Sequence, residues 1–572
     1  MSRLVRTSCA LLWLFVACGR SVNDAGGETN WLSCDTDEDC PAESRCVASR
    51  CTEPVHDADP DAGDDETPPP PDDDGIALGE CPAESSFSTV EAPAWEGGHV
   101  LVKITGESRG TLGESAFVGD VDGDGYGDFV VMDVGGSGPQ ASLDVQARGA
   151  AYLFYGRAPF EGEASDTGAG GEGGAGGAES DGGAGGAVEP FLEPFTELAA
   201  SQADMIVRGA NSSVSGLGDI NGDGYDDFAV VAACDSDCDS VVDGVHIFYG
   251  AADRYSGDWR ADEIGAHWVV AGSAYRVVRA GDVNGDDYAD VLVEASVQDN
   301  PSIYVTYLLL GRAEPLDEAL PDGSHDAVFV GDDVAMRSGA AGVGDIDDDG
   351  YDDLLFSVGE SDCSAAGFAL FYGADRFSTT MTPEQADASF SGASVWYVTG
   401  AIGDLDTDGY ADLALPSEVT ESDVKGVPGF VAVIYGRSER FSGAYDLANV
   451  MDFSVHPLAA LDGLAAGDLD GDGQRDLLVG DSKDQTTGFQ AGSLSVLPGS
   501  QQRLSGSFEL TPASAVIHGE SFRGGGNDML GYGTSSGGDV NGDGYDDSLV
   551  GATGNTIGDE DGGKVFLILG QP

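Results

Sequence analysis

Short runs of apolar, β-branched and aromatic residues recur along the chain from about residue 97 onward, and polar, glycine-rich segments separate them. Typical runs are FVVMDV at 129–134, AYLFYG at 151–156 and DMIVRG at 204–209. Runs of this length and composition, bounded by glycine and aspartate, are typical of β-strands. No long stretch with helical periodicity competes with them, so the pattern predicts an all-β fold.

A nine-residue acidic motif stands before one strand of each group and occurs seven times. The first copy reads DVDGDGYGD at 120–128, and the others occupy 219–227, 282–290, 345–353, 404–412, 468–476 and 539–547. The copies follow one another at roughly 60–70 residues, apart from a longer first interval, and such a period is typical of repeat architectures. About four strand-like runs fall in each repeat.

Seven four-stranded units predict a β-propeller with seven blades around a central axis. The last repeat reaches only its third strand, VFLILG at 565–570, whereas a spare strand, HVLVKITG at 99–106, precedes the first repeat. We therefore expect residues 99–105 to complete the last blade and close the ring, because closure removes the exposed strand edges of an open array.

The acidic motif has the chemistry of a calcium loop. Calcium binds roughly six to eight oxygen atoms, and the loop can supply side-chain oxygens at positions 1, 3, 5 and 9 and a backbone carbonyl at position 7. Carboxylates about 4 Å apart repel by roughly 4 kcal/mol per pair at an effective dielectric constant near 20, so the loop needs a counter-cation. The motif therefore predicts up to seven Ca²⁺ sites.

The predicted ligands are the residues at these five positions of each copy. They are Asp120, Asp122, Asp124, Tyr126 and Asp128; Asp219, Asn221, Asp223, Tyr225 and Asp227; Asp282, Asn284, Asp286, Tyr288 and Asp290; Asp345, Asp347, Asp349, Tyr351 and Asp353; Asp404, Asp406, Asp408, Tyr410 and Asp412; Asp468, Asp470, Asp472, Gln474 and Asp476; and Asp539, Asn541, Asp543, Tyr545 and Asp547.

The motif and its surroundings resemble the FG-GAP repeat. A strand ending in Gly-Asp precedes each motif, an apolar strand follows it, and the next strand often ends in Tyr-Gly, as in FALFYG at 368–373. The resemblance covers roughly residues 97–572. It implies the seven-bladed propeller of integrin α subunits, in which the motif is a calcium-binding hairpin loop between the first two strands of a blade and the propeller serves recognition.

Some copies depart from this pattern. Asp287 replaces the glycine at position 6 of copy three, where a positive φ costs energy for a residue with a side chain. Asp348 and Thr407 stand where glycine is common, and copy six has Gln474 and Arg475. We expect copies three and six to be the weakest sites. Rigid hairpins are the expected effect of calcium, and a calcium that bridges a ligand or takes part in catalysis is the alternative.

The charge balance limits the range of partners. The 572-residue chain has 25 Lys and Arg against 102 Asp and Glu, a formal net charge of −77. Nucleic-acid binders and proteins that dock on anionic lipid need a basic face, so neither activity is expected. Hydrophobic residues make up 41% of the chain, which is enough for a core. Much of the acid should therefore have a specific cationic partner.

The N-terminus has the pattern of an export signal. Arg3 and Arg6 precede an apolar run from Cys9 to Ala17 that is too short to span a bilayer. FVAC at 15–18 resembles the bacterial lipoprotein signal, which implies a signal peptide at 1–17 and lipidation of Cys18. Simple cleavage of a secretory signal is the alternative. We expect an exported protein of the bacterial cell envelope or outer surface, held by a lipid anchor or secreted.

A cysteine-rich module at 18–56 and a linker at 57–80 are expected between the signal and the propeller. In an exported chain Cys34, Cys40, Cys46 and Cys51 suggest two disulfides. A zinc site is the alternative, although the first two gaps are long for a zinc knuckle. Proline and like charges favour an extended linker, and the glycine-rich insert at 161–188 is expected to be a disordered loop.

No catalytic signature stands out in the sequence. The seven histidines lie outside any HExxH motif, and GAGGEGGAGGA has the glycines of a Rossmann fingerprint without a flanking strand and helix. The leading hypothesis is a non-catalytic propeller that binds a surface protein or polysaccharide, with a possible role in adhesion. The alternatives are a polysaccharide lyase or hydrolase, which predicts basic residues clustered in a cleft, and a purely structural envelope component. A self-closed ring predicts a monomer.

Overall fold

The computed structural model divides the chain into two compact units, Met1–Gly75 and Ile76–Pro572. The residues that it describes are 45–47, 50–52, 89–91, 98–106, 112–134, 149–157, 196–232, 244–268, 273–297, 300–313, 319–320, 324–331, 336–359, 367–392, 402–417, 429–458, 461–487, 490–510, 515–519, 528–554 and 563–571. Of the first unit this includes β1 (Arg45–Val47) and β2 (Arg50–Thr52), an antiparallel pair in which Cys46 lies opposite Cys51. The signal peptide, Cys18, the linker and the insert at 161–188 lie outside the described residues.

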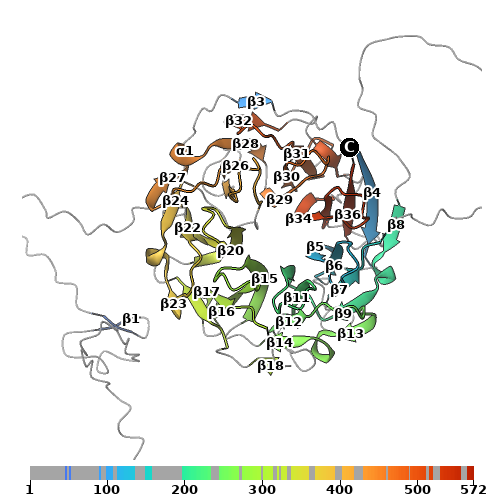
Figure 1. Ribbon diagram of the computed structural model, residues 1–572, viewed down its shortest axis with the longest axis horizontal. Helices are drawn as coiled ribbons and strands as arrows, with labels where there is room; N and C mark the ends of the chain where they lie inside the picture. The colour runs from blue at the N-terminus through green and yellow to red at the C-terminus, as the bar shows by residue number, and fades with distance from the viewer. Residues whose placement is uncertain are drawn as a thin grey trace, which may run out of the picture. The chain divides into compact units, whose positions relative to one another are not determined.

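The second unit is a ring of seven antiparallel sheets, which confirms the predicted seven-bladed propeller (Figure 1). Strands are listed from the centre outward. Blade I has β5 (Leu112–Gly119), β6 (Asp128–Asp133), β7 (Ala150–Phe154) and β9 (Met205–Arg208); blade II has β10 (Ser213–Gly218), β11 (Asp227–Ala232), β12 (Gly244–Phe248) and β14 (Ala266–Trp268); blade III has β15 (Ser273–Gly281), β16 (Asp290–Val297), β17 (Asn300–Leu309) and β19 (Ala327–Val330).

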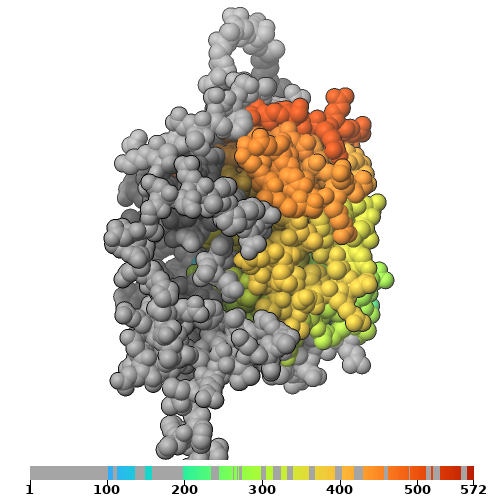
Figure 2. Space-filling view, turned by 90° about the vertical axis from the view of Figure 1, so that its left-hand side faces the viewer, coloured from blue at the N-terminus to red at the C-terminus, as the bar shows by residue number. Residues whose placement is uncertain are grey.

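The other four blades repeat this order, except that the described strands of blade V begin with its second strand. Blade IV has β20 (Met336–Gly344), β21 (Asp353–Val358), β22 (Gly367–Phe371) and β24 (Ala388–Ser391); blade V has β25 (Leu413–Ser417), β26 (Gly429–Ile434) and β28 (Phe453–Leu458); blade VI has β29 (Leu461–Gly467), β30 (Asp476–Asp481), β31 (Ser493–Leu497) and β33 (Ala515–His518); blade VII has β34 (Leu530–Gly538), β35 (Asp547–Ala552), β36 (Lys564–Gln571) and β4 (Gly98–Thr105). In the side view of Figure 2 the described residues follow one another in chain order, from green through yellow to orange.

The hydrophobic core lies between the blades. Six of the seven second strands are buried along their whole length, and β16 is buried except at its last two residues, because neighbouring blades cover both faces; this explains their continuous apolar sequences. One cluster joins Leu355, Phe368 and Leu370 of blade IV to Leu415 and Ile434 of blade V, and comparable clusters occur around the ring. The contacts are therefore between blades that follow one another in the chain.

Strand β4 closes the ring, as the sequence predicted. It pairs with β36 along its full length, from Gly98 opposite Gln571 to Thr105 opposite Lys564. Val102 and Ile104 of β4 are fully buried in the same cluster as Val565 and Leu567. The last blade is thus held by backbone hydrogen bonds and apolar packing between the two ends of the propeller sequence.

The prediction of four strands per blade is incomplete for six of the blades. A short fifth strand pairs in parallel with each outer strand: β13 (Gly257–Arg260) with β9, β18 (Ala319–Leu320) with β14, β23 (Thr380–Met381) with β19, β27 (Gly443–Asp446) with β24, β32 (Gly506–Glu509) with β28, and β8 (Thr196–Ala199) with β4. β3 (Thr89–Glu91) adds to β32. Each of the six precedes the fourth strand of the next repeat, and mostly exposed strands such as β13 give no apolar pattern to read.

One helical turn follows four of these fifth strands and leads into the next outer strand. The turns are η4 (Ala200–Gln202), η5 (Ala261–Glu263), η6 (Pro383–Gln385) and α1 (Leu447–Val450). A residue of the turn fixes its start: Gln202 accepts the Ala199 N–H at 2.7 Å, and Gln385 accepts the Thr382 N–H at 2.9 Å. Among the described residues no helix is long and apolar enough to cross a membrane.

Candidate metal centre

In six blades the acidic motif lies between the first and second strands, with its last aspartate as the first residue of the second strand; in blade V, where the described strands begin with the second, the motif ends immediately before β25. We number the loops one to seven with blades I to VII. In loop one the Asp120 carboxylate accepts the backbone N–H groups of Asp124 at 3.0 Å and Gly125 at 2.9 Å. The Asp124 carboxylate accepts the Tyr126 N–H at 3.0 Å. The loop therefore folds its own amides around its acidic side chains.

Residues at positions 4 and 6 give this loop its tight turn. In loop one they are Gly123 and Gly125, with φ of 72° and 90°. Asp287, Asp348 and Thr407 replace such glycines in other loops and adopt φ of 69°, 56° and 57°. The sequence expectation for Asp287 is confirmed, because the loop imposes its left-handed conformation on residues that adopt it only at a cost.

The position 9 aspartate is the most buried aspartate of each loop. Asp128 is fully buried and accepts two backbone N–H groups, from Val121 at 2.9 Å and from Gly156 at 2.8 Å. All seven loops repeat this arrangement, with Asp128, Asp227, Asp290, Asp353, Asp412, Asp476 and Asp547. This side chain ties the loop to the end of the third strand.

Burial raises the pKa of these position 9 carboxyls. The pKa of Asp128 rises from 3.8 to about 7 because desolvation outweighs the two backbone hydrogen bonds, and Asp120 and Asp122 add like charge. The pKa of Asp353 rises to about 8 for the same reasons. A carboxylate that is costly to ionise in the free protein gains a counter-charge when a divalent cation binds beside it.

The glycine that ends each third strand is a part of the loop that sequence reasoning missed. A Cβ on Gly156 would lie 2.4 Å from the Gly127 carbonyl oxygen, and one on Gly436 would lie 2.3 Å from the Ala411 carbonyl oxygen. The Tyr-Gly ending was visible in the sequence, but its partner was not. Only glycine allows the third strand to approach position 8 of the loop this closely.

Neighbouring loops are joined to one another around the ring. Asp226 of loop two donates its N–H to the Asp120 carbonyl at 3.2 Å, and Gly127 of loop one donates to the Asp539 carbonyl of loop seven at 2.8 Å. The Tyr225 ring covers position 4 of loop one, where a Cβ on Gly123 would lie 2.6 Å from the ring. The position 4 glycine of one loop and the position 7 tyrosine of the next loop therefore pack against each other across the junction between two blades.

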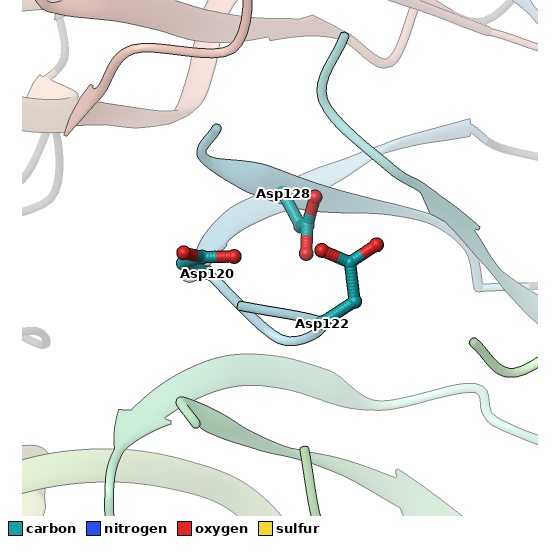
Figure 3. A group of neighbouring side chains, drawn as sticks. All are labelled: Asp120, Asp122 and Asp128. Carbon is teal, nitrogen blue, oxygen red and sulfur yellow. The ribbon is translucent and has the colours of Figure 1, made fainter. Parts of the chain in front are cut away.

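Four loops bring three carboxylates together in a way that could hold a metal ion. In each triad one oxygen per residue lies within 4.8 Å of the others; the triads are Asp120, Asp122 and Asp128; Asp345, Asp347 and Asp353; Asp404, Asp406 and Asp412; and Asp468, Asp470 and Asp476 (Figure 3 shows the first). The buried Oδ1 atoms of Asp347, Asp406 and Asp468 have no hydrogen-bond partner. An unpartnered buried carboxylate oxygen is costly, so these residues fit a bound cation.

Loops two, three and seven have asparagine at position 3. Its side-chain amide still contacts the position 5 aspartate: Asn221 Nδ2 donates to the Asp223 carboxylate at 3.1 Å, and Asn221 Oδ1 accepts the Asp223 N–H at 2.9 Å. Asn541 contacts Asp543 in the same two ways, each at 2.9 Å. In loop six Arg475 donates to the Ala466 carbonyl at 2.9 Å, so its guanidinium is bonded to the first strand. That copies three and six are the weakest sites stays a prediction.

Comparison with known proteins gives no family for the chain. No protein-family model matches it. No curated protein matches it either. Among solved structures it is similar to a protein of unknown function from Dyadobacter fermentans DSM 18053, at 11% sequence identity and a TM-score of 0.31, over 82% of this chain and 98% of that chain.

The pentapeptide pattern GxSxG of serine hydrolases occurs twice in the chain, at 106–110 and at 533–537, and Ser108 of the first copy lies outside the described residues. Ser535 lies inside strand β34 and its hydroxyl accepts the Phe117 N–H at 3.3 Å. A nucleophile elbow stands at a sharp turn from a strand into a helix, whereas Ser535 is a mid-strand residue that joins β34 to β5 of the next blade.

Proposed function

We propose that the chain is an exported calcium-binding β-propeller of the FG-GAP type that acts as a binding or adhesion scaffold for a protein or polysaccharide at the cell surface. The observation that carries the calcium proposal is the convergence of three carboxylates in each of four loops, with unpartnered buried oxygens at Asp347, Asp406 and Asp468. An all-oxygen donor set of this kind suits a hard cation such as Ca²⁺.

Bound calcium would supply the positive charge that the clustered carboxylates lack. In the triad loops the position 1 and position 3 side chains of the turn and the position 9 carboxylate of the second strand would hold the ion, and position 5 is the further ligand that the sequence predicts. Because backbone hydrogen bonds join the loops at six of the seven junctions, ordering one of these loops stabilises the junction between two blades. At about 1 mM calcium a site with a dissociation constant of ~0.1 mM contributes ~1.4 kcal/mol. Seven such sites contribute roughly 10 kcal/mol, comparable to the stability of a whole domain.

The location and the partner are supported by the sequence alone. Arg3, Arg6 and the apolar run before Cys18 support export with a lipid anchor, and an exterior location supplies millimolar calcium. The excess of acidic residues favours a partner other than nucleic acid. A rigid ring whose connecting loops vary in length is suited to present binding loops, and this supports recognition rather than catalysis.

The alternative is a propeller-type lyase or hydrolase that degrades a polysaccharide. It requires basic side chains gathered where an acidic glycan would bind. In the described part of the chain, Arg254, Arg440 and Arg503 are each paired with aspartates of the loops, and Arg208 is paired with Asp258. Because these arginines are already paired with aspartates, they favour a binding scaffold over an enzyme that degrades an acidic glycan. Incubation of the purified protein with acidic and neutral glycans, followed by reducing-end analysis, tests the enzyme directly.

The calcium proposal is tested by metal content and thermal unfolding. The full chain is purified in millimolar calcium, its bound metals are counted, and its melting temperature is measured with calcium and with a chelator. We expect several equivalents of calcium and a large fall in melting temperature on chelation. Little bound metal and an unchanged melting temperature would refute it. Pull-down from cell-surface extracts with the calcium-loaded protein then separates a scaffold with a specific partner from a structural envelope component.

A further inference from the structure

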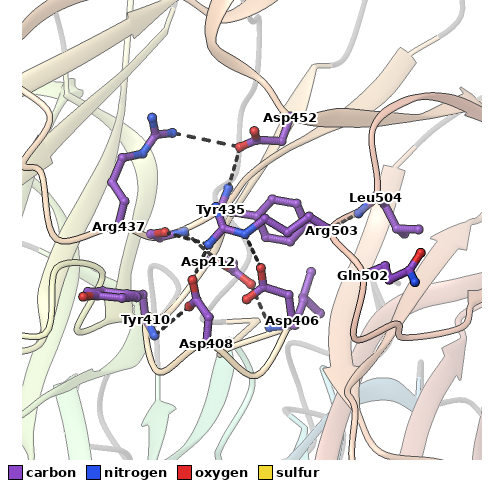
Figure 4. A network of polar contacts seen from close by, with 12 residues as sticks. Asp406, Asp408, Tyr410, Asp412, Tyr435, Arg437, Asp452, Gln502, Arg503 and Leu504 are labelled. Carbon is purple, nitrogen blue, oxygen red and sulfur yellow. Dashed lines mark hydrogen bonds and ion pairs between the residues drawn. The ribbon is translucent and has the colours of Figure 1, made fainter.

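Among the described residues, three of the seven loops receive an arginine from the following blade. Arg503, which follows β31 of blade VI, places Nε 2.5 Å from Asp406 Oδ2 of loop five and also pairs with Asp408 (Figure 4). Arg254 of repeat two pairs in the same way with Asp122 and Asp124, and Arg440 of repeat five pairs with Asp347 and Asp349. Each guanidinium thus bridges positions 3 and 5 of a loop in the preceding blade.

A tyrosine completes each of these contacts. The Arg503 guanidinium lies 4.9 Å from the centre of the Tyr435 ring, and the Tyr435 hydroxyl accepts the Leu504 N–H at 2.8 Å (Figure 4). Tyr155 and Tyr372 contact Arg254 and Arg440 in the same two ways. We call this set an arginine clasp: the position 3 and position 5 aspartates, the tyrosine that precedes the third-strand glycine, and the arginine of the next repeat.

The parts of the clasp occur together in the sequence. The arginine stands four residues after the glycine that ends a third strand, and the loops that it reaches all have aspartate at position 3. Loops two and three have Asn221 and Asn284 at position 3, and the matching positions of the next repeats hold Pro315 and Phe377. Loop seven has Asn541, and the matching residue is Phe160.

At positions 1, 3, 5 and 9 the two kinds of loop have the same formal charge once the arginine is counted. Four carboxylates at positions 1, 3, 5 and 9 of loops one, four and five, together with one guanidinium, sum to −3. The three carboxylates at these positions of loops two and seven also sum to −3. The extra aspartate of a clasp loop therefore comes with its own counter-charge.

The arginine leaves the place of the metal open. In loops four and five it pairs with the Oδ2 atoms of Asp347 and Asp406, whose side chains are 3% exposed. The Oδ1 atoms of the same two residues are buried and have no hydrogen-bond partner, and both residues belong to the carboxylate triads. One side of each position 3 carboxylate thus faces the arginine, and the other is available to a cation.

We infer that six of the metal loops fall into two classes: loops one, four and five hold both a cation and an arginine of the next blade, whereas loops two, three and seven depend on the cation alone. Loop six has Asp470 at position 3 without a paired arginine among the described residues, so it belongs to neither class. The inference rests on the proposed calcium binding. In a clasp loop the arginine keeps the carboxylates in place and links two blades when calcium is removed. The arginine is a positioning residue, and it makes three of the blade junctions less dependent on calcium than the others.

The test uses the full chain with R503Q, D406N/R503Q and the control R437Q. The Arg437 side chain is 39% exposed and lies 4.0 Å from Asp452 (Figure 4). Its guanidinium is 4.3 Å from the Phe441 ring, so it shares the chemistry of Arg503 without pairing with a loop carboxylate. Melting temperatures are measured in millimolar calcium and in chelator. We expect R503Q to lower the melting temperature at least twice as much in chelator as in calcium, because four carboxylates then lack any counter-charge.

The double variant tests the charge balance. D406N/R503Q gives loop five an amide at position 3 and no arginine, as in loops two and seven. Its melting temperature in chelator should therefore lie above that of R503Q. R437Q should lower the melting temperature by the same amount in calcium and in chelator. Equal losses for R503Q in the two conditions, with no recovery in the double variant, would mean that the arginine only packs on Tyr435 and would overturn the inference. Should the wild type gain no stability from calcium, the calcium proposal fails, but the comparison in chelator still decides whether the clasp exists.

Discussion

Removal of calcium should reverse the ordinary pH dependence of stability. Seven position 9 aspartates are buried, and their pKa rises from 3.8 to about 7, or about 8 for Asp353. In the metal-free protein the folded state therefore holds protons that the unfolded state has released between about pH 4 and pH 7. Stability falls with rising pH wherever the folded state binds more protons.

The magnitude follows from the size of the shift. A rise of about 3 pKa units corresponds to roughly 4 kcal/mol of unfavourable free energy for each ionised carboxyl, at about 1.4 kcal/mol per unit. Several such groups titrate together, so in chelator the melting temperature should fall from pH 5 toward pH 7 and should level off near pH 8, where the carboxyls are ionised in both the folded and the unfolded state. Calcium binds the ionised form, so in millimolar calcium the fall should be much smaller or absent.

The assay is thermal unfolding followed by circular dichroism from pH 5 to pH 8, at matched ionic strength, with calcium and with a chelator. Asp258→Asn is a suitable control, because Asp258 is an exposed carboxylate paired with Arg208 outside the loops. The control should keep the wild-type slope, whereas Asp412→Asn removes one titrating group and should make the chelator curve shallower. A melting temperature in chelator that is constant or rises between pH 5 and pH 8 would refute the reasoning.

Three further predictions test the closure, the loop geometry and the anchor. Ile104→Ala in the closing strand should cost about 2–5 kcal/mol in urea unfolding, whereas Lys103→Ala, at a partly exposed side chain paired with Glu197, should cost about 1 kcal/mol or less; equal effects would contradict closure through a packed blade. Gly436→Ala should cost about 1–3 kcal/mol, because its Cβ would lie 2.3 Å from the Ala411 carbonyl oxygen, and unchanged stability would contradict that close approach. Cys18→Ala should abolish incorporation of labelled fatty acid into the exported protein, and persistent labelling would place the anchor elsewhere.

The sequence by itself predicted the features that depend on neighbours in the chain. The nine-residue loop is local: Asp120, Asp124 and Asp128 meet through hydrogen bonds to amides within eight residues, so their pattern could be read directly. Alternating apolar strands and a constant period predicted the seven blades. The spare strand before the first repeat predicted closure, because an unpaired strand edge is costly in any repeat fold.

Tertiary structure decided the features that join one blade to another. The fifth strands are short and exposed, and they form only because the outer strand of the preceding blade offers a free edge beside them. Arg503 and Asp406 are 97 residues apart and carry no local signal of their contact. The reason is physical: a period in the sequence fixes the fold of each repeat, whereas the partners across a blade junction depend on the angle and distance at which two sheets pack.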